Sequence, residues 1–271
     1  MDGARGALPR AASTILLREA GGDEPFEVYL LRRPDAARFA PGAYSFPGGV
    51  LDPADLAAAR TAVAALPGGL DTAALQRRMG AGPDFPVPDA ALSAALLVCA
   101  ARELFEEAGV LVAREETGGL VPLDNEARWA AVREDLLAAR VGFGATLYED
   151  GLTIAPDDLP YFSHWVTPEG PTLRFDTHFF LAVLPPGQQA GFWSGEMAGE
   201  AWLGPRAALA RHAAGKLPML AVQTHHLERF ARFASLAALL DHARAKGVPP
   251  VLPVRGADGT VSLAAEVAEC W

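Results

Sequence analysis

Apolar runs along the chain predict two pairs of β-strands. Residues 13–19 and 26–33 are dense in branched and aromatic side chains, which favour strands, and a glycine pair and a proline between them are typical of a turn. Residues 161–168 and 174–185 repeat this composition on either side of the turn sequence EGPT. We therefore expect a strand pair near the start of the chain and a hairpin in its second half.

Most of the remaining pattern is helical. Apolar residues recur at intervals of three and four, with Gly- and Pro-rich segments between the periodic stretches. The expected helices cover residues 56–65, 72–79, 90–109, 125–139, 206–216 and 224–246. The segment 38–55 is different, because three prolines and three glycines rule out one regular element across it. The tail after Val248 is rich in proline and weakly β.

The helix over residues 90–109 carries two contrasting faces. Asp89 is suited to its N-cap, and Gly109 to the left-handed position just past its end. At about 100° per residue, one face holds Leu97, Ala101, Leu104, Phe105 and Ala108, which predicts burial against a sheet. The opposite face holds Glu103, Glu106 and Glu107.

Three glutamates this close together on one helix repel one another by a few tenths of a kcal/mol per pair. They also lie near the C-terminal end, where the helix dipole disfavours carboxylates, and only Arg102 offers compensation on the same helix. A bound divalent cation accounts for the cluster, and oxygen-only ligands suit Mg²⁺ or Mn²⁺ rather than zinc. The plainer interpretation is a solvated helix face that ends in a glycine.

A glycine-rich segment upstream favours the metal interpretation. In SFPGGVLDPAD, residues 45–55, the carbonyls of a glycine pair can approach a metal because no Cβ obstructs them, and Asp55 follows. The two segments together resemble the signature of the Nudix hydrolases, which reads Gly, five residues, Glu, seven residues, then Arg-Glu-apolar-x-Glu-Glu-x-Gly-apolar. The matching positions are Gly49, Arg102, Glu103, Leu104, Glu106, Glu107, Gly109 and Val110.

This signature is interrupted. The acid after the glycine is Asp55 rather than Glu, and Arg102 follows it by 47 positions instead of 8, so 39 additional residues split the motif. Closing a longer loop costs only about 0.6 kcal/mol per doubling of its length. The insertion can therefore extend outward without separating the glycine segment from the helix, and we expect it to form an exposed lobe.

The resemblance covers residues 12–245 and is closest to one branch of the family. The segment LLRRPDAARFAPGAYSFPGG looks like the sequence before the motif in coenzyme A diphosphatases, with Arg33, Arg38 and Gly42 at that branch's spacing. Leu31 and Pro34 depart from the branch pattern. The whole layout is most similar to the mammalian peroxisomal coenzyme A diphosphatases with an interrupted motif and to their bacterial relatives.

The resemblance implies an α+β fold, a Nudix-type α/β/α sandwich around a mixed β-sheet. We expect residues 1–271 to form a single Nudix hydrolase domain. Within it, residues 56–90 are a helical insertion in the motif, and residues 205–246 are a C-terminal helical extension.

The resemblance also implies the roles of site residues. Two divalent cations, Mg²⁺ or Mn²⁺, would be held by Gly49 (through its carbonyl), Glu103, Glu106 and Glu107. The implied catalytic residues are Arg102, which orients a carboxylate, Glu103, Glu106 and an additional acid, Glu200. Glu200 precedes an aromatic residue at the start of a strand and is preferred to Glu196, although both fit ordinary loop acids. The candidates for holding substrate phosphates are Arg32, Arg33, Arg38 and Arg174, each of which also fits an ordinary surface arginine.

The expected reaction is the metal-dependent hydrolysis of a nucleoside diphosphate linkage. The leading substrate is coenzyme A or an acyl-coenzyme A, cleaved to 3′,5′-ADP and the (acyl-)4′-phosphopantetheine part. One alternative is a Nudix pyrophosphatase that acts on NADH, ADP-ribose or another nucleotide derivative. Another is a non-catalytic nucleotide-binding Nudix module, although such a protein has no physical reason to keep a repulsive cluster of carboxylates.

Charge and composition narrow the partners. A net charge of −10 argues against unspecific binding to nucleic acid or to an anionic membrane. We expect a small-molecule nucleotide as substrate, no nucleic acid or membrane partner, and a homodimer. Two cysteines, no apolar signal segment and no Ser-Lys-Leu type terminus together favour a cytoplasmic location.

Overall fold

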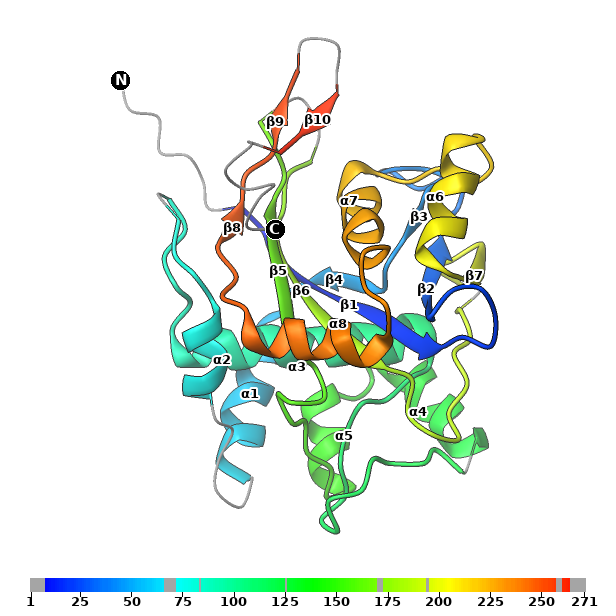
Figure 1. Cartoon of the computed structure of the whole chain (residues 1–271). Coiled ribbons are helices and arrows are strands. Elements are labelled where there is room, and N and C mark those ends of the chain that lie inside the picture. The colour runs from blue at the N-terminus through cyan, green and yellow to red at the C-terminus, as the bar shows by residue number, and fades with distance from the viewer. Residues whose placement is uncertain are drawn as a thin grey trace.

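A mixed β-sheet lies at the centre of the folded molecule (Figure 1). The computed structural model describes residues 8–65, 72–82, 84–124, 126–169, 173–193, 195–256 and 260–263. The sheet has the order β3-β2-β1-β6-β5-β8, with β4 beside β1 and β7 beside β2. Its strands are β1 Arg10–Glu19, β2 Phe26–Arg32, β3 Tyr44–Ser45, β4 Gly48–Val50, β5 Tyr161–Val166, β6 Asp176–Val183, β7 Gly199–Leu203 and β8 Pro250–Val251. A small second sheet joins β9 Val254–Arg255 to β10 Val261–Ser262.

The central strand β1 has different neighbours along its two halves. One edge pairs in parallel with β6 over most of its length. On the other edge, residues 11–13 pair with β4 and residues 17–19 pair with β2, both in antiparallel fashion. The pairing of β1 with β2 and the antiparallel pairing of β5 with β6 confirm the two predicted strand pairs. The junction with β4 brings Gly48 and Gly49 into the sheet beside β1.

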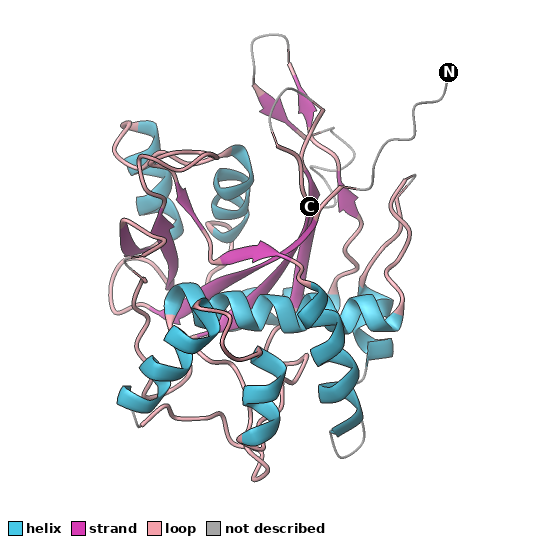
Figure 2. Ribbon diagram, turned by 180° about the vertical axis from the view of Figure 1, so that it is seen from behind, coloured by secondary structure: helices cyan, strands magenta, loops and turns pink. Residues whose placement is uncertain are grey.

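Helices cover both faces of the sheet, which confirms the predicted α/β/α sandwich. The helix α3 shares one hydrophobic core with α1, α2, α4, α5 and one face of the sheet, and α6, α7 and α8 share another core with the other face. In the view from behind, the strands lie above a long helix, and further helices lie below it (Figure 2). The helices are α1 Pro53–Ala65, α2 Thr72–Arg78, α3 Ala90–Ala108, α4 Glu126–Leu137, α5 Phe143–Glu149, α6 Pro205–Ala213, α7 Ala221–Phe230 and α8 Leu236–Ala245.

The helix α3 begins and ends where the sequence predicts. Asp89 Oδ1 accepts a hydrogen bond from Leu92 N at 2.8 Å, so Asp89 is the N-cap. Gly109 adopts a φ of 68° and donates to the carbonyl of Phe105, which ends the helix in the left-handed conformation that glycine allows. The predicted apolar face is buried, and so is nearly every residue from 93 to 101 on the other faces.

The helices of the insertion account for that additional burial. Ala59 of α1, Leu75 of α2 and Met79 are each at most 3% exposed and belong to the same hydrophobic core as α3. A Cβ placed on Gly144 of α5 would lie 2.4 Å from Ala58 Cβ, so α1 also packs closely on α5. The expectation of an exposed lobe is therefore wrong, because these apolar side chains cover α3.

Two helical segments differ from the sequence prediction. The expected helix 224–246 is two helices, α7 and α8, because Ser235 starts a new helix by accepting a hydrogen bond from Ala238 N at 3.1 Å. The helix α5 has no counterpart in the prediction, since its seven residues are too few for a clear helical period.

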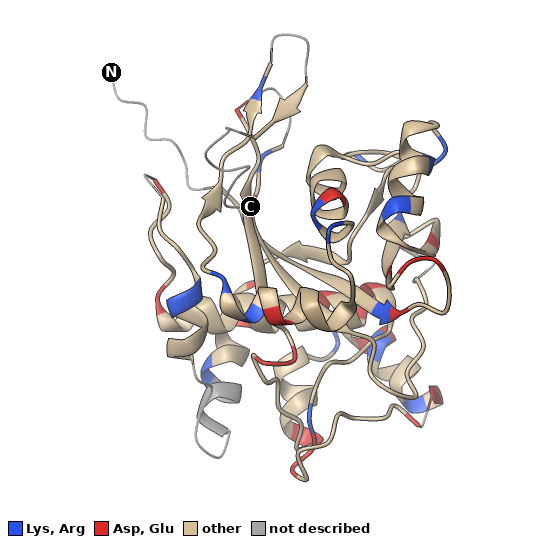
Figure 3. Cartoon of the chain, in the orientation of Figure 1, with Lys and Arg blue, Asp and Glu red and all other residues tan. Residues whose placement is uncertain are grey.

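Charged side chains are distributed over most elements rather than gathered on one of them (Figure 3). Within the described ranges, none of the helices combines the length and the hydropathy that a membrane span requires.

Candidate active site

The C-terminal half of α3 brings its glutamates to the glycines of β4. Glu103 and Glu107, one turn apart, line a pocket of about 490 Å³ together with Gly48 and Gly49. Gly48 N donates a hydrogen bond to Glu107 Oε2 at 2.8 Å across 59 positions of sequence. The two segments that the sequence analysis paired therefore meet in the folded chain.

Gly49 lies directly beside the Glu103 carboxylate. A Cβ placed on Gly49 would lie 2.3 Å from Glu103 Oε1, so a larger residue would displace the carboxylate. The Gly49 carbonyl oxygen is 3.9 Å from Cys99 Sγ, one turn of α3 before Glu103. The Gly49 backbone thus packs against the turn of α3 that runs from Cys99 to Glu103.

Arg102 connects the acids to the start of the insertion. Its Nε and Nη2 donate to the two oxygens of Asp55 at 2.8 and 2.9 Å. Its Nη1 donates to Glu103 Oε1 and Glu106 Oε2, each at 2.8 Å. Asp55 is 1% exposed and also accepts a hydrogen bond from Asp52 N. The bidentate pair of Arg102 and Asp55 joins the two parts of the interrupted motif, and the shorter side chain of Asp55 still reaches the arginine.

Burial raises the pKa of all three glutamates. Loss of solvation is the largest cause and raises the pKa of Glu103 to about 7 and that of Glu107 to about 8. The pKa of Glu106 is also raised by burial, although the Arg102 guanidinium opposes the shift. Burial alone would lower the pKa of Arg102, but its hydrogen bonds to Asp55 and the charge of Glu103 raise it overall. A cation placed among these carboxylates would favour their charged forms.

The pocket beside the glutamates combines an apolar wall with a positive charge. Arg33 lines it, and the charge of Arg33 acts to lower the pKa of Glu107. The aromatic residues that line it are Phe39, Tyr44, Phe46, Trp165, Phe175 and Phe179. The pocket can therefore receive a ligand that carries both a negative charge and an apolar part.

The structure brings one of the four predicted arginines into the pocket lining. Arg33 is that residue. Arg32 forms an ion pair with Asp35 at 2.5 Å, and Arg174 donates to a backbone carbonyl of the pocket wall at 3.0 Å. Arg38 is exposed. A contact of these three with substrate stays a prediction.

Sequence reasoning missed part of the pocket. Arg255 of β9 and residues 220–223, at the start of α7, also line it. Both segments follow the motif by more than a hundred residues and carry no motif of their own, so only the folded arrangement identifies them.

Two further acids are candidates for a role beside the cluster. Glu200 is on β7, in the strand that the sequence predicts, and its Oε2 accepts hydrogen bonds from Tyr29 Oη and Phe192 N. Glu196, in the preceding loop, raises the pKa of both Glu106 and Glu107 through its charge. A role for Glu200 as the additional acid stays a prediction, and Glu196 acts electrostatically on the cluster.

Comparison with known proteins identifies the class to which this fold and site belong. The crystal structure of a NUDIX hydrolase from Alicyclobacillus acidocaldarius matches with a TM-score of 0.66 and 26% sequence identity, over 88% of this chain and 97% of that one. The family model described as the NUDT19 Nudix domain matches residues 9–230, and the chain belongs to that family. Divalent metals are used generally by Nudix hydrolases.

Two relatives are named acyl-coenzyme A diphosphatase NUDT19. The one from Homo sapiens is 33% identical in an alignment of 256 positions that spans 80% of this chain and 63% of the relative. The one from Gallus gallus is 29% identical in an alignment of 309 positions that spans 93% of this chain and 77% of the relative. The chain thus spans slightly less than two thirds of the human protein's length. These matches confirm the resemblance to the coenzyme A diphosphatase branch.

Proposed function

We propose that this chain hydrolyses the diphosphate linkage of coenzyme A or an acyl-coenzyme A. The products are 3′,5′-ADP and the (acyl-)4′-phosphopantetheine part. The observation that carries the proposal is the group of glutamates on α3: Glu103 and Glu107 line the pocket of Arg33 beside Gly48 and Gly49, and Arg102 joins Glu106 to Glu103. The names of the human and chicken relatives support the substrate class.

The oxygen donors present are of the kind that a divalent cation prefers. Gly49 (through its carbonyl), Glu103, Glu106 and Glu107 would hold it, an oxygen-only set that suits Mg²⁺ or Mn²⁺. Burial is the main cause of the raised pKa values of the three carboxylates, because it disfavours their charged forms. A cation beside them would stabilise those charged forms. When bound, such an ion neutralises the diphosphate and lowers the pKa of the attacking water.

Protein side chains then orient the site and the substrate. Arg102 is a positioning residue, because its hydrogen bonds fix the carboxylates of Glu103 and Glu106. Arg33 binds a substrate phosphate, because the planar guanidinium can donate two parallel hydrogen bonds to phosphate oxygens. The apolar wall around Trp165 receives the pantetheine or acyl part.

The remaining predicted roles belong to the same proposal. Glu200 is the additional acid at the end of the site, and Glu196 is its alternative. The proposal assigns the 3′-phosphate of the nucleotide to Arg32, Arg38 and Arg174: the first two are near Arg33 in sequence, and Arg174 donates to Thr167 of the pocket lining. A homodimer and a cytoplasmic location stay predictions.

A panel of substrates tests the proposal. The purified chain is incubated with Mg²⁺ or Mn²⁺ and coenzyme A, an acyl-coenzyme A, NADH or ADP-ribose, and the products are separated by chromatography. We expect 3′,5′-ADP from the coenzyme A substrates, loss of turnover in Glu106→Gln, and unchanged turnover in Glu116→Gln, a matched change at an exposed glutamate. Both variants should keep the wild-type melting temperature.

Each other outcome points to a different function. Preferred cleavage of NADH or ADP-ribose would keep the Nudix chemistry but reject the coenzyme A substrates. Nucleotide binding without turnover would indicate a non-catalytic module. Full turnover in Glu106→Gln would leave the cluster as a buried group of carboxylates held by Arg102, without a catalytic role.

A further inference from the structure

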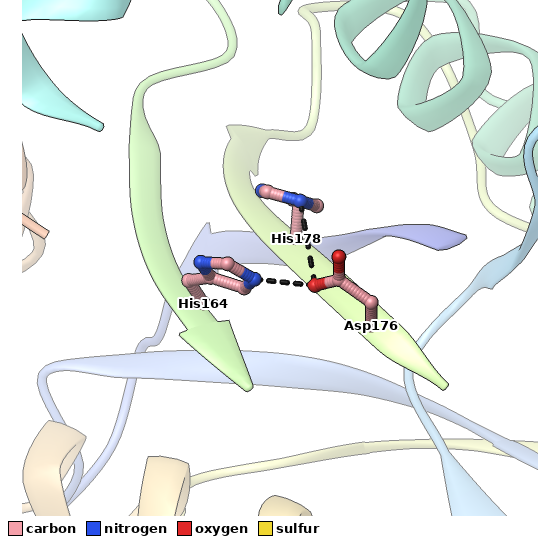
Figure 4. Close-up of side chains that lie close together, drawn as sticks. All are labelled: His164, Asp176 and His178. Carbon is pink, nitrogen blue, oxygen red and sulfur yellow. Dashed lines mark hydrogen bonds and ion pairs between the residues drawn. The ribbon is translucent and has the colours of Figure 1, made fainter. Parts of the chain in front are cut away.

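A second group of metal-ligating side chains lies outside the glutamate cluster. His164 of β5 and Asp176 and His178 of β6 are all buried, and one ligand atom from each lies within 4.8 Å of the others. His164 Nε2 bonds to Asp176 Oδ1, and His178 Nε2 is 3.7 Å from the same oxygen (Figure 4). The two imidazole rings stack at a centroid distance of 4.1 Å. Both histidines therefore present a ring nitrogen to the same carboxylate oxygen.

The strand register explains why they meet. His164 and His178 are direct cross-strand partners, and Asp176 lies two residues before His178 on the same face of β6. A bulge in β5 between Tyr161 and Ser163 shifts the alternation of side chains. Tyr161 therefore faces the same side as His164 and contacts His178.

Neighbouring groups orient this cluster. The Tyr161 hydroxyl is 2.8 Å from His178 Nδ1, which turns Nε2 of that ring toward Asp176. Arg10 Nε approaches the other carboxylate oxygen, Oδ2, at 3.8 Å, so Oδ1 remains the oxygen that both histidines face. Histidines that ligate metals almost always bond through their second ring nitrogen to such an outer partner.

The two ring nitrogens of His178 are also placed as in a metal ligand, one on Tyr161 and the other toward Asp176. When Nδ1–H donates to Tyr161 Oη, Nε2 presents a lone pair to a carboxylate. A cation between the two stabilises that otherwise repulsive arrangement.

We propose that His164, Asp176 and His178 form a second metal site that binds a zinc-class transition-metal ion. Two imidazoles and one carboxylate suit zinc and related ions better than magnesium. Tetrahedral zinc with bonds of about 2.0–2.1 Å places its ligand atoms roughly 3.4 Å apart, close to the 3.7 Å between His178 Nε2 and Asp176 Oδ1. The ion takes the place of the hydrogen bond between His164 Nε2 and Asp176 Oδ1, and these two atoms move apart to admit it.

This site is separate from the glutamates and keeps an open side. His164, Asp176 and His178 line a pocket of about 420 Å³ with Arg10 and residues 84–89. Their sequence neighbours Trp165 and Thr177 line the pocket of the glutamates instead, so the two pockets use alternate residues of the same strands. Three protein ligands leave a fourth position of the ion for water or a small ligand from the 420 Å³ pocket. The proposal does not depend on the hydrolase activity.

Zinc binding to the whole chain tests the proposal. Equilibrium dialysis with Mg²⁺ in large excess, which occupies the carboxylate cluster, is followed by elemental analysis of zinc. We expect about one zinc ion per wild-type chain, as for a site with a full ligand set. His164→Asn and His178→Asn should lose it, and Tyr161→Phe should weaken binding roughly 10- to 100-fold by removing the outer partner. Zinc at a hundred times its dissociation constant should raise the wild-type melting temperature by roughly 5 °C.

Matched variants keep the test decisive. His225→Asn, at a histidine on α7 outside the cluster, should bind zinc like the wild type, as should Glu106→Gln. Tyr161→Phe removes only a hydroxyl, so it reports on the site even if the histidine variants fail to fold. Absence of zinc binding to the wild type would leave the cluster as a structural His–Asp pair. Equal zinc affinity in all three cluster variants, or loss of zinc in Glu106→Gln, would place the ion elsewhere and overturn the proposal.

Discussion

Single side chains decide how the two halves of the interrupted motif are held together. Arg102 makes hydrogen bonds to three acids, of which Asp55 lies 47 positions away. The sequence predicts that Arg102 orients a carboxylate, but it leaves the role of Asp55 open because the acid is one methylene short. Nothing in the residue types shows that the start of α1 would bring this shorter acid close enough.

Removing Arg102 should therefore destabilise the fold. Arg102→Ala leaves Asp55, which is 1% exposed, without its partner, and we expect the free energy of unfolding to fall by about 3–5 kcal/mol. Arg140→Ala removes an exposed ion pair with Asp135 and should change stability by less than about 1 kcal/mol. Urea unfolding of both variants measures the difference, and equal stability of the two would contradict the role of Arg102.

The glutamates should also make stability depend on pH. Burial raises the pKa of Glu103 to about 7 and of Glu107 to about 8, above the ordinary value of 4.5. Between pH 4.5 and the raised pKa values, the folded protein binds more protons than the unfolded chain. The free energy of unfolding of the metal-free protein should therefore fall as the pH rises toward 8. Added Mg²⁺ should reduce this fall, because the cation favours the charged carboxylates.

Denaturation between pH 6.5 and 8.5, with chelator or with Mg²⁺, measures this dependence. Glu107→Gln should flatten the metal-free profile, since glutamine does not titrate. A wild-type profile that rises through this range, or one identical to that of Glu107→Gln, would contradict the buried, neutral state of Glu107.

Among the elements, α3 is the most predictable because its signals are local. Its N-cap, its C-terminal glycine and its apolar face are all readable in residues 89–109, and the structure confirms them. The break between α7 and α8 was harder to predict, because the apolar stripe continues across it while Ser235 caps a new helix. The burial of α1 and α2 depends on contacts with α3 that no local pattern records.

The contact between β4 and α3 carries a prediction of its own. Gly49→Ala places a Cβ about 2.3 Å from Glu103 Oε1, so the carboxylate must move away from the Gly49 carbonyl. We expect turnover to fall by roughly 100-fold or more, as a small misplacement in an active site can cause. Gly22→Ala, at an exposed turn with open space for a Cβ, should leave turnover unchanged. Kinetics with coenzyme A compare the two, and full activity in Gly49→Ala would separate Gly49 from the site.

At the scale of the whole molecule, the sequence predicts the glutamate half of the pocket but not its opposite wall. Gly49, Glu103 and Glu107 belong to one motif, whereas Arg255 and the start of α7 reach the pocket only through the fold. The cluster of His164, Asp176 and His178 could not be predicted from the sequence for a similar reason. Its members come from two strands, and a bulge in β5 sets which of their side chains share a face.

The insertion should be indispensable to the molecule as a whole. Leu75 is 3% exposed within the core shared with α3, so Leu75→Ala should cost about 2–5 kcal/mol. Leu173→Ala makes the same change at a side chain that is 61% exposed and should cost less than about 0.5 kcal/mol. Thermal unfolding measures both, and similar melting temperatures would show that the insertion is a loosely attached lobe.

A crystal soaked in Mn²⁺, with diffraction recorded at the manganese edge, tests the central claim most directly. The account predicts anomalous density between the Gly49 carbonyl and the carboxylates of Glu103, Glu106 and Glu107, and its loss in crystals of Glu106→Gln. Manganese bound only elsewhere, with these carboxylates free of any ion in a fully soaked crystal, would contradict it.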